Sequence, residues 1–176
     1  MGDETWNGYF KFTVARNPWD YLVSRFWWEI AKASEKGVSL PTVKRSRVKE
    51  KLFDPKAYGR AMKVLFSNVK KQEPITDFRV FLENLDPWFI NDRFYFDESG
   101  QPLADFYLRY ENLEKDYEEV CGRLGIPYSP LMKTKSKARK DCRHYTASYD
   151  DRSRSIVEEK CAREIAYFNY RFEEAP

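Results

Sequence analysis

The chain contains 176 residues with a formal net charge of +3, and 42% of the residues are hydrophobic and 17% aromatic. This length and hydrophobic content predict one globular domain, residues 1–176, with a core of its own. The weak net charge does not fit a general nucleic-acid binder, and no run of about 18 apolar residues is present to form a membrane-spanning helix. The opening residues Met1–Glu4 also lack the basic and apolar regions of a signal peptide.

The first predicted elements are a strand and a helix in direct succession. Aromatic and β-branched residues over Tyr9–Val14 predict a buried strand of about six residues. Asn17 then suits the N-cap of a helix, and Pro18 suits its first position. An apolar stripe at helical spacing continues the helix toward Gly37, where it is expected to end.

Two polar residues stand out in this strand–helix unit. Arg16 lies at the carboxyl end of the predicted strand, and Ser24 lies about two turns into the helix. Ligands of open α/β sheets bind beyond the carboxyl ends of strands, and a guanidinium with a hydroxyl can hold a phosphate there. The alternative is a structural role, in which Arg16 pairs with a carboxylate and Ser24 faces solvent. Spacing alone leaves both interpretations open.

Further helices and one more strand are predicted along the chain. After a polar segment over 38–56, which suits a loop, a surface helix or a glycan-binding edge, helical periodicity predicts a helix over 55–71. Helix-type spacing also extends from Thr76 to Leu85, and an extended segment is predicted over 88–95. The remaining elements are a strand over Leu103–Tyr110, a helix over 111–124 closed by Gly125, and a last helix from Asp150 or Asp151 to Phe168.

The order of these elements indicates a helix-rich α/β fold. Two strands do not make a stable parallel sheet on their own, so a strand is missing or unrecognised. The cysteines Cys121, Cys142 and Cys161 and the single histidine, His144, show no metal-binding spacing, and no metal site is predicted. Cys121 and Cys161 fall on apolar helix faces and are expected in the core.

The run RNPWDYLVS, which begins at Arg16 and follows YFKFTVA, resembles a motif of carbohydrate-type sulfotransferases (sulfotransferase family two). In that family the motif contacts the 3′-phosphate of 3′-phosphoadenosine 5′-phosphosulfate (PAPS), the sulfuryl donor. The resemblance implies that Arg16 and Ser24 contact this phosphate. It also implies a P-loop-like sulfotransferase fold, with PAPS and its product adenosine 3′,5′-bisphosphate (PAP) as ligands and without a metal.

Two later segments resemble the same family. The run DFYLRYENLEKDYEEVCGRLGIP over 105–127 is similar to its second signature, and residues 133–172 are similar to its closing segment. In the family, a basic loop before the final helix folds over the nucleotide end of the cofactor. The resemblance therefore implies cofactor contacts in that loop, or alternatively an exposed basic run, and the matching residues are Lys135, Ser136, Lys137 and Arg139.

One part of the family pattern has no match in the 176 residues. The family begins with a strand and a loop that cradles the 5′-phosphosulfate, and neither precedes the strand that begins at Tyr9. The resemblance thus implies a fold that is incomplete at the N-terminus, with the first strand and the phosphate loop missing. We expect little sulfotransferase activity from this chain alone, and we expect the exposed sheet edge to favour pairing with a second chain. No catalytic residue is assigned.

The resemblance implies transfer of a sulfuryl group from PAPS to a hydroxyl of a carbohydrate or a similar acceptor, by positioning and charge stabilisation. The alternative is a truncated, non-catalytic relative that binds an anionic nucleotide, a glycan or a partner chain. A single-stranded nucleic-acid binder fits less well, because the aromatic residues fall on helix stripes and not between the charges. We expect a soluble domain, cytoplasmic in a bacterial or viral protein, or in the Golgi lumen if it is part of a eukaryotic enzyme.

Overall fold

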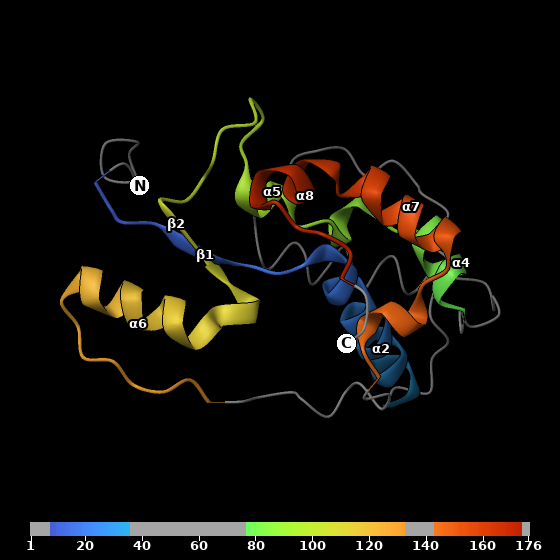
Figure 1. The fold of residues 1–176 in the computed structure, drawn as a ribbon, viewed down its shortest axis with the longest axis horizontal. Helices are drawn as coiled ribbons and strands as arrows, with labels where there is room; N and C mark the ends of the chain where they lie inside the picture. The colour runs from blue at the N-terminus through green and yellow to red at the C-terminus, as the bar shows by residue number, and fades with distance from the viewer. Residues whose placement is uncertain (1–7, 36–76, 133–142, 174–176) are drawn as a thin grey trace.

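The computed structural model describes residues 8–35, 77–132 and 143–173, whose arrangement is shown in Figure 1. Within these ranges the chain is a helix-rich α/β structure with one two-stranded parallel sheet, as the order of predicted elements indicates. The strands are β1 (Phe12–Ala15) and β2 (Phe106–Arg109). The helices are α2 (Pro18–Glu35), α4 (Phe78–Glu83), α5 (Asp92–Tyr95), α6 (Leu113–Leu124), α7 (Asp151–Lys160) and α8 (Ala162–Phe168), and the 3₁₀ helices are η1 (Pro87–Phe89), η2 (Tyr110–Asn112) and η3 (Tyr145–Ser148).

The predicted succession of strand and helix is confirmed at the junction of β1 and α2. Asn17 caps the helix, since its Oδ1 accepts a hydrogen bond from the backbone N–H of Trp19 at 3.1 Å. Pro18 occupies the first helical position, where its missing N–H leaves no hydrogen bond unmade. The cap and the proline together explain why the chain turns from strand to helix within two residues.

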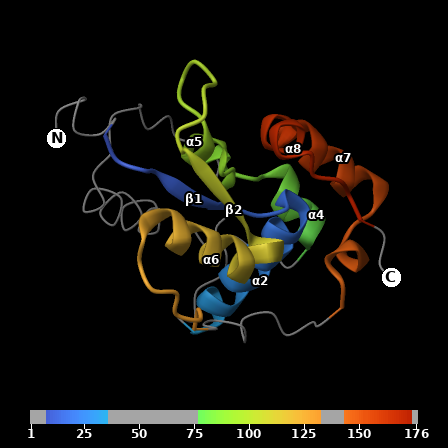
Figure 2. The ribbon, with the colours of Figure 1, turned by 60° about the vertical axis from the view of Figure 1, so that its left-hand side comes forward.

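The prediction that β1 is buried is wrong, because Phe12 and Val14 are each 44% exposed. The strands pair in register, Phe12 beside Phe106 and Val14 beside Leu108, so these four side chains share one face of the sheet. Figure 2 shows α6 on one side of the strands and α5 on the other. On the α6 side the helix packs against β2, which buries Leu108 and leaves Phe12 and Val14 accessible.

Three other predicted elements differ from the structure. The segment 88–95 is not extended, because Asp86 caps η1 by accepting the Trp88 N–H at 2.8 Å, and α5 follows. The second strand covers only Phe106–Arg109, since the chain enters η2 at Tyr110. The last helix is divided at Cys161 into α7 and α8.

Two predicted helix ends are confirmed. Gly125 ends α6 with φ of 66°, a left-handed conformation that glycine adopts without a Cβ clash. Asp150 caps α7 through a capping box with Ser153. The predicted helix over 55–71, the loop over 38–56 and Gly37 lie outside the described residues.

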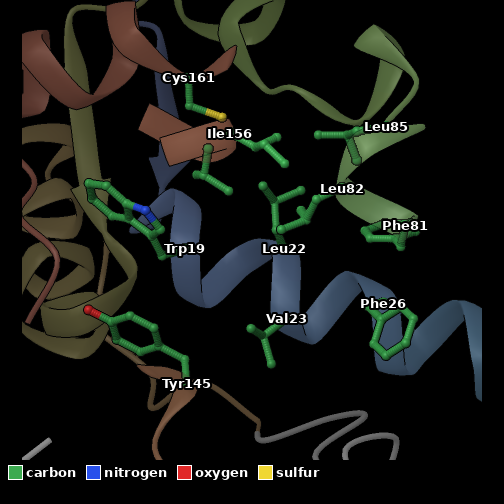
Figure 3. Packing of buried hydrophobic residues seen from close by; sticks show 11 residues of the cluster. Trp19, Leu22, Val23, Phe26, Phe81, Leu82, Leu85, Tyr145, Ile156 and Cys161 are labelled. Atoms are coloured by element: carbon green, nitrogen blue, oxygen red, sulfur yellow. The ribbon is translucent and has the colours of Figure 1, made fainter. Parts of the chain in front are cut away.

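The main hydrophobic core is organised around α2. Leu22 and Val23 are fully buried, and Figure 3 shows Leu22 directed toward Leu82 of α4 and Ile156 of α7. A second, smaller cluster joins the sheet to α5 and α8 through Ala15, Tyr95, Phe96 and Phe168. The buried residues of the main cluster are Trp19, Leu22, Val23, Phe26, Phe81, Leu82, Leu85, Tyr145, Ile156, Val157 and Cys161.

None of the helices in the described ranges combines the length and the apolar composition that a membrane crossing requires.

Candidate functional site

The junction between β1 and α2 is the point at which distant parts of the chain meet. Asn17 is 4% exposed, and its backbone N–H donates to the Glu111 carboxylate, with N and Oε1 separated by 2.7 Å. Its side-chain Nδ2 donates to the backbone carbonyl of Arg171 at 3.3 Å. Asn17 therefore connects the carboxyl ends of both strands with the segment that follows α8.

The segment Tyr170–Glu173, which we call the C-terminal strap, is held by aromatic contacts and a hydrogen bond. The ring of Phe172 lies 5.7 Å from the ring centroids of Trp19 and Tyr145 and 5.4 Å from that of Tyr149, in edge-on geometry. The backbone N–H of Glu173 donates to the Tyr145 hydroxyl at 2.9 Å. These contacts place the strap beside the N-terminus of α2.

A cavity of about 370 Å³ opens at this meeting point. Its lining side chains include groups of both charges together with one imidazole, one amide and one phenol. Burial raises the pKa of the Tyr145 phenol, so its hydroxyl stays protonated at neutral pH and keeps a proton to donate. The lining residues are Asn17, Asp20, Glu111, Arg143, His144, Tyr145 and Glu173.

Arg16 lies directly before this junction and is held by Asp20. Both Nε and Nη2 of Arg16 bind Oδ2 of Asp20, at 2.7 and 2.5 Å, and the guanidinium stacks over the Tyr110 ring at 4.1 Å. The carboxylate pairing that we considered as the structural alternative is therefore present. This pairing engages only some of the N–H donors of Arg16, because a guanidinium carries five and Asp20 binds Nε and Nη2.

Ser24 and Arg16 are not brought together in the cavity. Ser24 is half-buried on α2, one turn beyond Asp20, and neither Ser24 nor Arg16 belongs to the cavity lining. Asp20, which pairs with Arg16, does line the cavity. The predicted cofactor-binding residues Lys135, Ser136, Lys137 and Arg139 lie outside the described residues.

The structure adds residues that sequence reasoning did not assign to the site. His144 lines the cavity, and its Nδ1 lies 2.9 Å from the Thr146 hydroxyl. Glu111 lies two residues after the end of β2, so its position near a strand end was a usable signal. Glu173 had no such signal, because only the docking of the strap brings it to the cavity.

Within residues 8–35, 77–132 and 143–173, no three His, Cys, Asp or Glu side chains form a group that could hold a metal ion. Comparison of the chain with protein-family models, with curated proteins and with solved structures finds no match. The site is therefore interpreted from its own residues and from the motifs that they form.

Proposed function

We propose that this chain is a PAPS-binding domain of the sulfotransferase type, with a P-loop-like α/β fold. Its reaction class is the transfer of a sulfuryl group from PAPS to a hydroxyl, with a carbohydrate or a similar acceptor. The product that remains in the nucleotide site is PAP. In this proposal Arg16 and Ser24 contact the 3′-phosphate, and the basic residues of the segment 133–142 contact the nucleotide.

The observation that carries the proposal is the meeting of three segments at Asn17. The strand–helix motif, the segment after β2 and the closing segment are the three parts of the chain in which the family resemblance was recognised. Glu111 and Arg171, from the second and third of these segments, both accept hydrogen bonds from Asn17 of the first. Segments 94 and 154 residues apart thus build one end of the sheet, where α/β folds bind ligands.

Two features next to this junction favour an anionic group. The N-terminus of α2, an 18-residue helix, contributes a partial positive charge. Asp20 fixes the orientation of the Arg16 guanidinium, which favours directed hydrogen bonds to a phosphate. The negative charges of Asp20 and Glu111 are partly balanced by Arg16 and by the Asn17 N–H.

The alternative function is a non-catalytic module that binds the nucleotide, a glycan or a partner chain. The accessible Phe12 and Val14 side chains on β1 favour a surface that a second chain can cover. Incubation with labelled PAPS and a panel of glycan acceptors, with mass measured in solution, separates the two functions. Turnover supports the enzyme, and nucleotide binding without turnover supports the module.

Calorimetric titration with PAP tests the binding site itself. Arg16→Ala is expected to weaken binding by about 2–3 kcal/mol, since a charge-assisted contact to the 3′-phosphate is lost. Arg123→Ala is the matched control, because Arg123 also binds one carboxylate oxygen, of Glu119, through Nε and Nη2 and lies over an aromatic ring, that of Phe106. Equal affinity of the native chain and the Arg16 variant would reject Arg16 as a phosphate contact.

A further inference from the structure

The C-terminal strap brings a carboxylate to the cavity. Glu173 belongs to the cavity lining, and its backbone N–H is bound to the hydroxyl of Tyr145, which is another lining residue. The preceding residue, Phe172, is enclosed by three aromatic rings and by the guanidinium of Arg154 at 4.8 Å. The backbone position of Glu173 is therefore set by the packing of the strap, and its side chain is exposed at the cavity.

Among the described residues, the charges around the cavity are not balanced. Three carboxylates, those of Asp20, Glu111 and Glu173, face the guanidinium groups of Arg143 and of Arg16, which pairs with Asp20. With His144 neutral, the formal charge of this set is −1, and removal of the Glu173 charge brings it to zero. In the described part of the chain, the Asp20 carboxylate has an ion pair and Glu111 a hydrogen bond, whereas the structure shows no ion pair for Glu173.

We propose that Glu173 is a specificity-determining residue of the cavity, whose carboxylate weakens the binding of a ligand in proportion to the ligand's negative charge. The proposal rests on the proposed function, because the ligand is the same nucleotide. A carboxylate within a few ångströms of a phosphate repels it, and the repulsion grows with each phosphate and falls with added salt. The same carboxylate still accepts hydrogen bonds from neutral hydroxyl or amine groups, so it discriminates between ligands by their charge more than by their shape.

The test uses Glu173→Gln with three probes of rising charge: adenosine, adenosine 5′-monophosphate and PAP. The variant should bind PAP about five- to tenfold more tightly than the native chain and the monophosphate about two- to threefold more tightly, with adenosine unchanged. The gain for PAP should shrink at high salt. Glu159→Gln, an equal charge change at an exposed position of α7, is the matched control and should leave all three affinities unchanged.

A second variant tests whether the strap acts through this carboxylate. Phe172→Ala should release the strap and raise the affinity for PAP by a similar factor, and the double variant should gain no more than either single change. Additive gains would overturn the proposal, as would equal PAP affinity of native and Glu173→Gln chains or an equal gain in Glu159→Gln. If Arg16→Ala still weakens PAP binding in those cases, the proposed function stands without Glu173. Absence of PAP binding to every chain would overturn both proposals.

Discussion

The α2 core and the sheet region both contain apolar and aromatic side chains, but they differ in how completely these side chains are buried. The α2 core contains eleven buried residues, which come from α2, α4, η3 and α7 and include Leu85 after α4 and Cys161 after α7, whereas the cluster at the sheet contains four. Glu164 of α8, which is 2% exposed, lies beside Cys161 of the α2 core and has no hydrogen-bond partner at Oε2 within the described structure. From this difference we expect the α2 core to contribute more to stability than the sheet region, where the Phe12 and Val14 side chains stay accessible to solvent.

The largest expected effect is in the α2 core. Leu22→Ala should destabilise the chain by about 3–4 kcal/mol, since Leu22 is fully buried and the change leaves a cavity against α4 and α7. Urea unfolding measures the change in free energy. A loss below about 1 kcal/mol would show that the α2 core does not dominate the stability.

The second prediction concerns the buried carboxyl group of Glu164 in α8. Burial raises the pKa of Glu164 to about 7; a hydrogen bond with Cys161 works against this shift and the Asp92 carboxylate adds to it. Above pH 7 the folded state holds an ionised buried group, so Glu164→Gln should raise the free energy of unfolding by about 2–3 kcal/mol at pH 8. Urea unfolding at pH 4 and pH 8 measures this gain.

The sign follows from proton binding. Between pH 4.5, the ordinary pKa of the group, and about pH 7, the folded chain keeps a proton that the unfolded chain has released. The native stability contributed by this group therefore falls as the pH rises through that window, and below pH 4.5 the variant should show little gain. Parallel pH profiles of native and variant chains would contradict the raised pKa, and Glu159→Gln is the control for a charge change at the surface.

The smallest expected effect is on the accessible face of β1. Phe12→Ala should cost about 1 kcal/mol or less, because the side chain is already 44% exposed and loses little burial. The same urea measurement applies, with Leu22→Ala as the reference for a buried position. A loss as large as that of Leu22→Ala would mean that another part of the chain, or a second copy, covers Phe12 in solution.

Local signals in the sequence predicted much of the α2 side correctly. Asn17 and Pro18 start α2, Asp150 starts α7 and Gly125 ends α6, and each of these depends on backbone geometry within a few residues. The alternative role of Arg16, pairing with a carboxylate, is also present, and the structure identifies Asp20 as its partner. Such features need no knowledge of the rest of the chain.

Features that depend on distant contacts were predicted poorly. The aromatic and β-branched composition of residues 9–14 indicated burial, but composition does not reveal that α6 covers only the neighbouring strand. Glu173 could not be placed in the cavity, since its position depends on how Phe172 docks against Trp19. The roles of Arg16 and Ser24 also stay a prediction, because the structure pairs Arg16 with Asp20 and leaves Ser24 apart from the cavity.

The junction at Asn17 has a consequence for the order of events in folding. Its hydrogen bonds close loops of 94 and 154 residues, and such contacts carry a larger entropy cost than local ones and tend to form late. Asn17→Ala keeps the backbone bond to Glu111 and removes the side-chain bond to Arg171, and we expect it to speed unfolding more than it slows folding. During synthesis, the cavity cannot be completed until Arg171 has left the ribosome, so a nascent chain carries α2 and its neighbours before its cavity is closed by the strap.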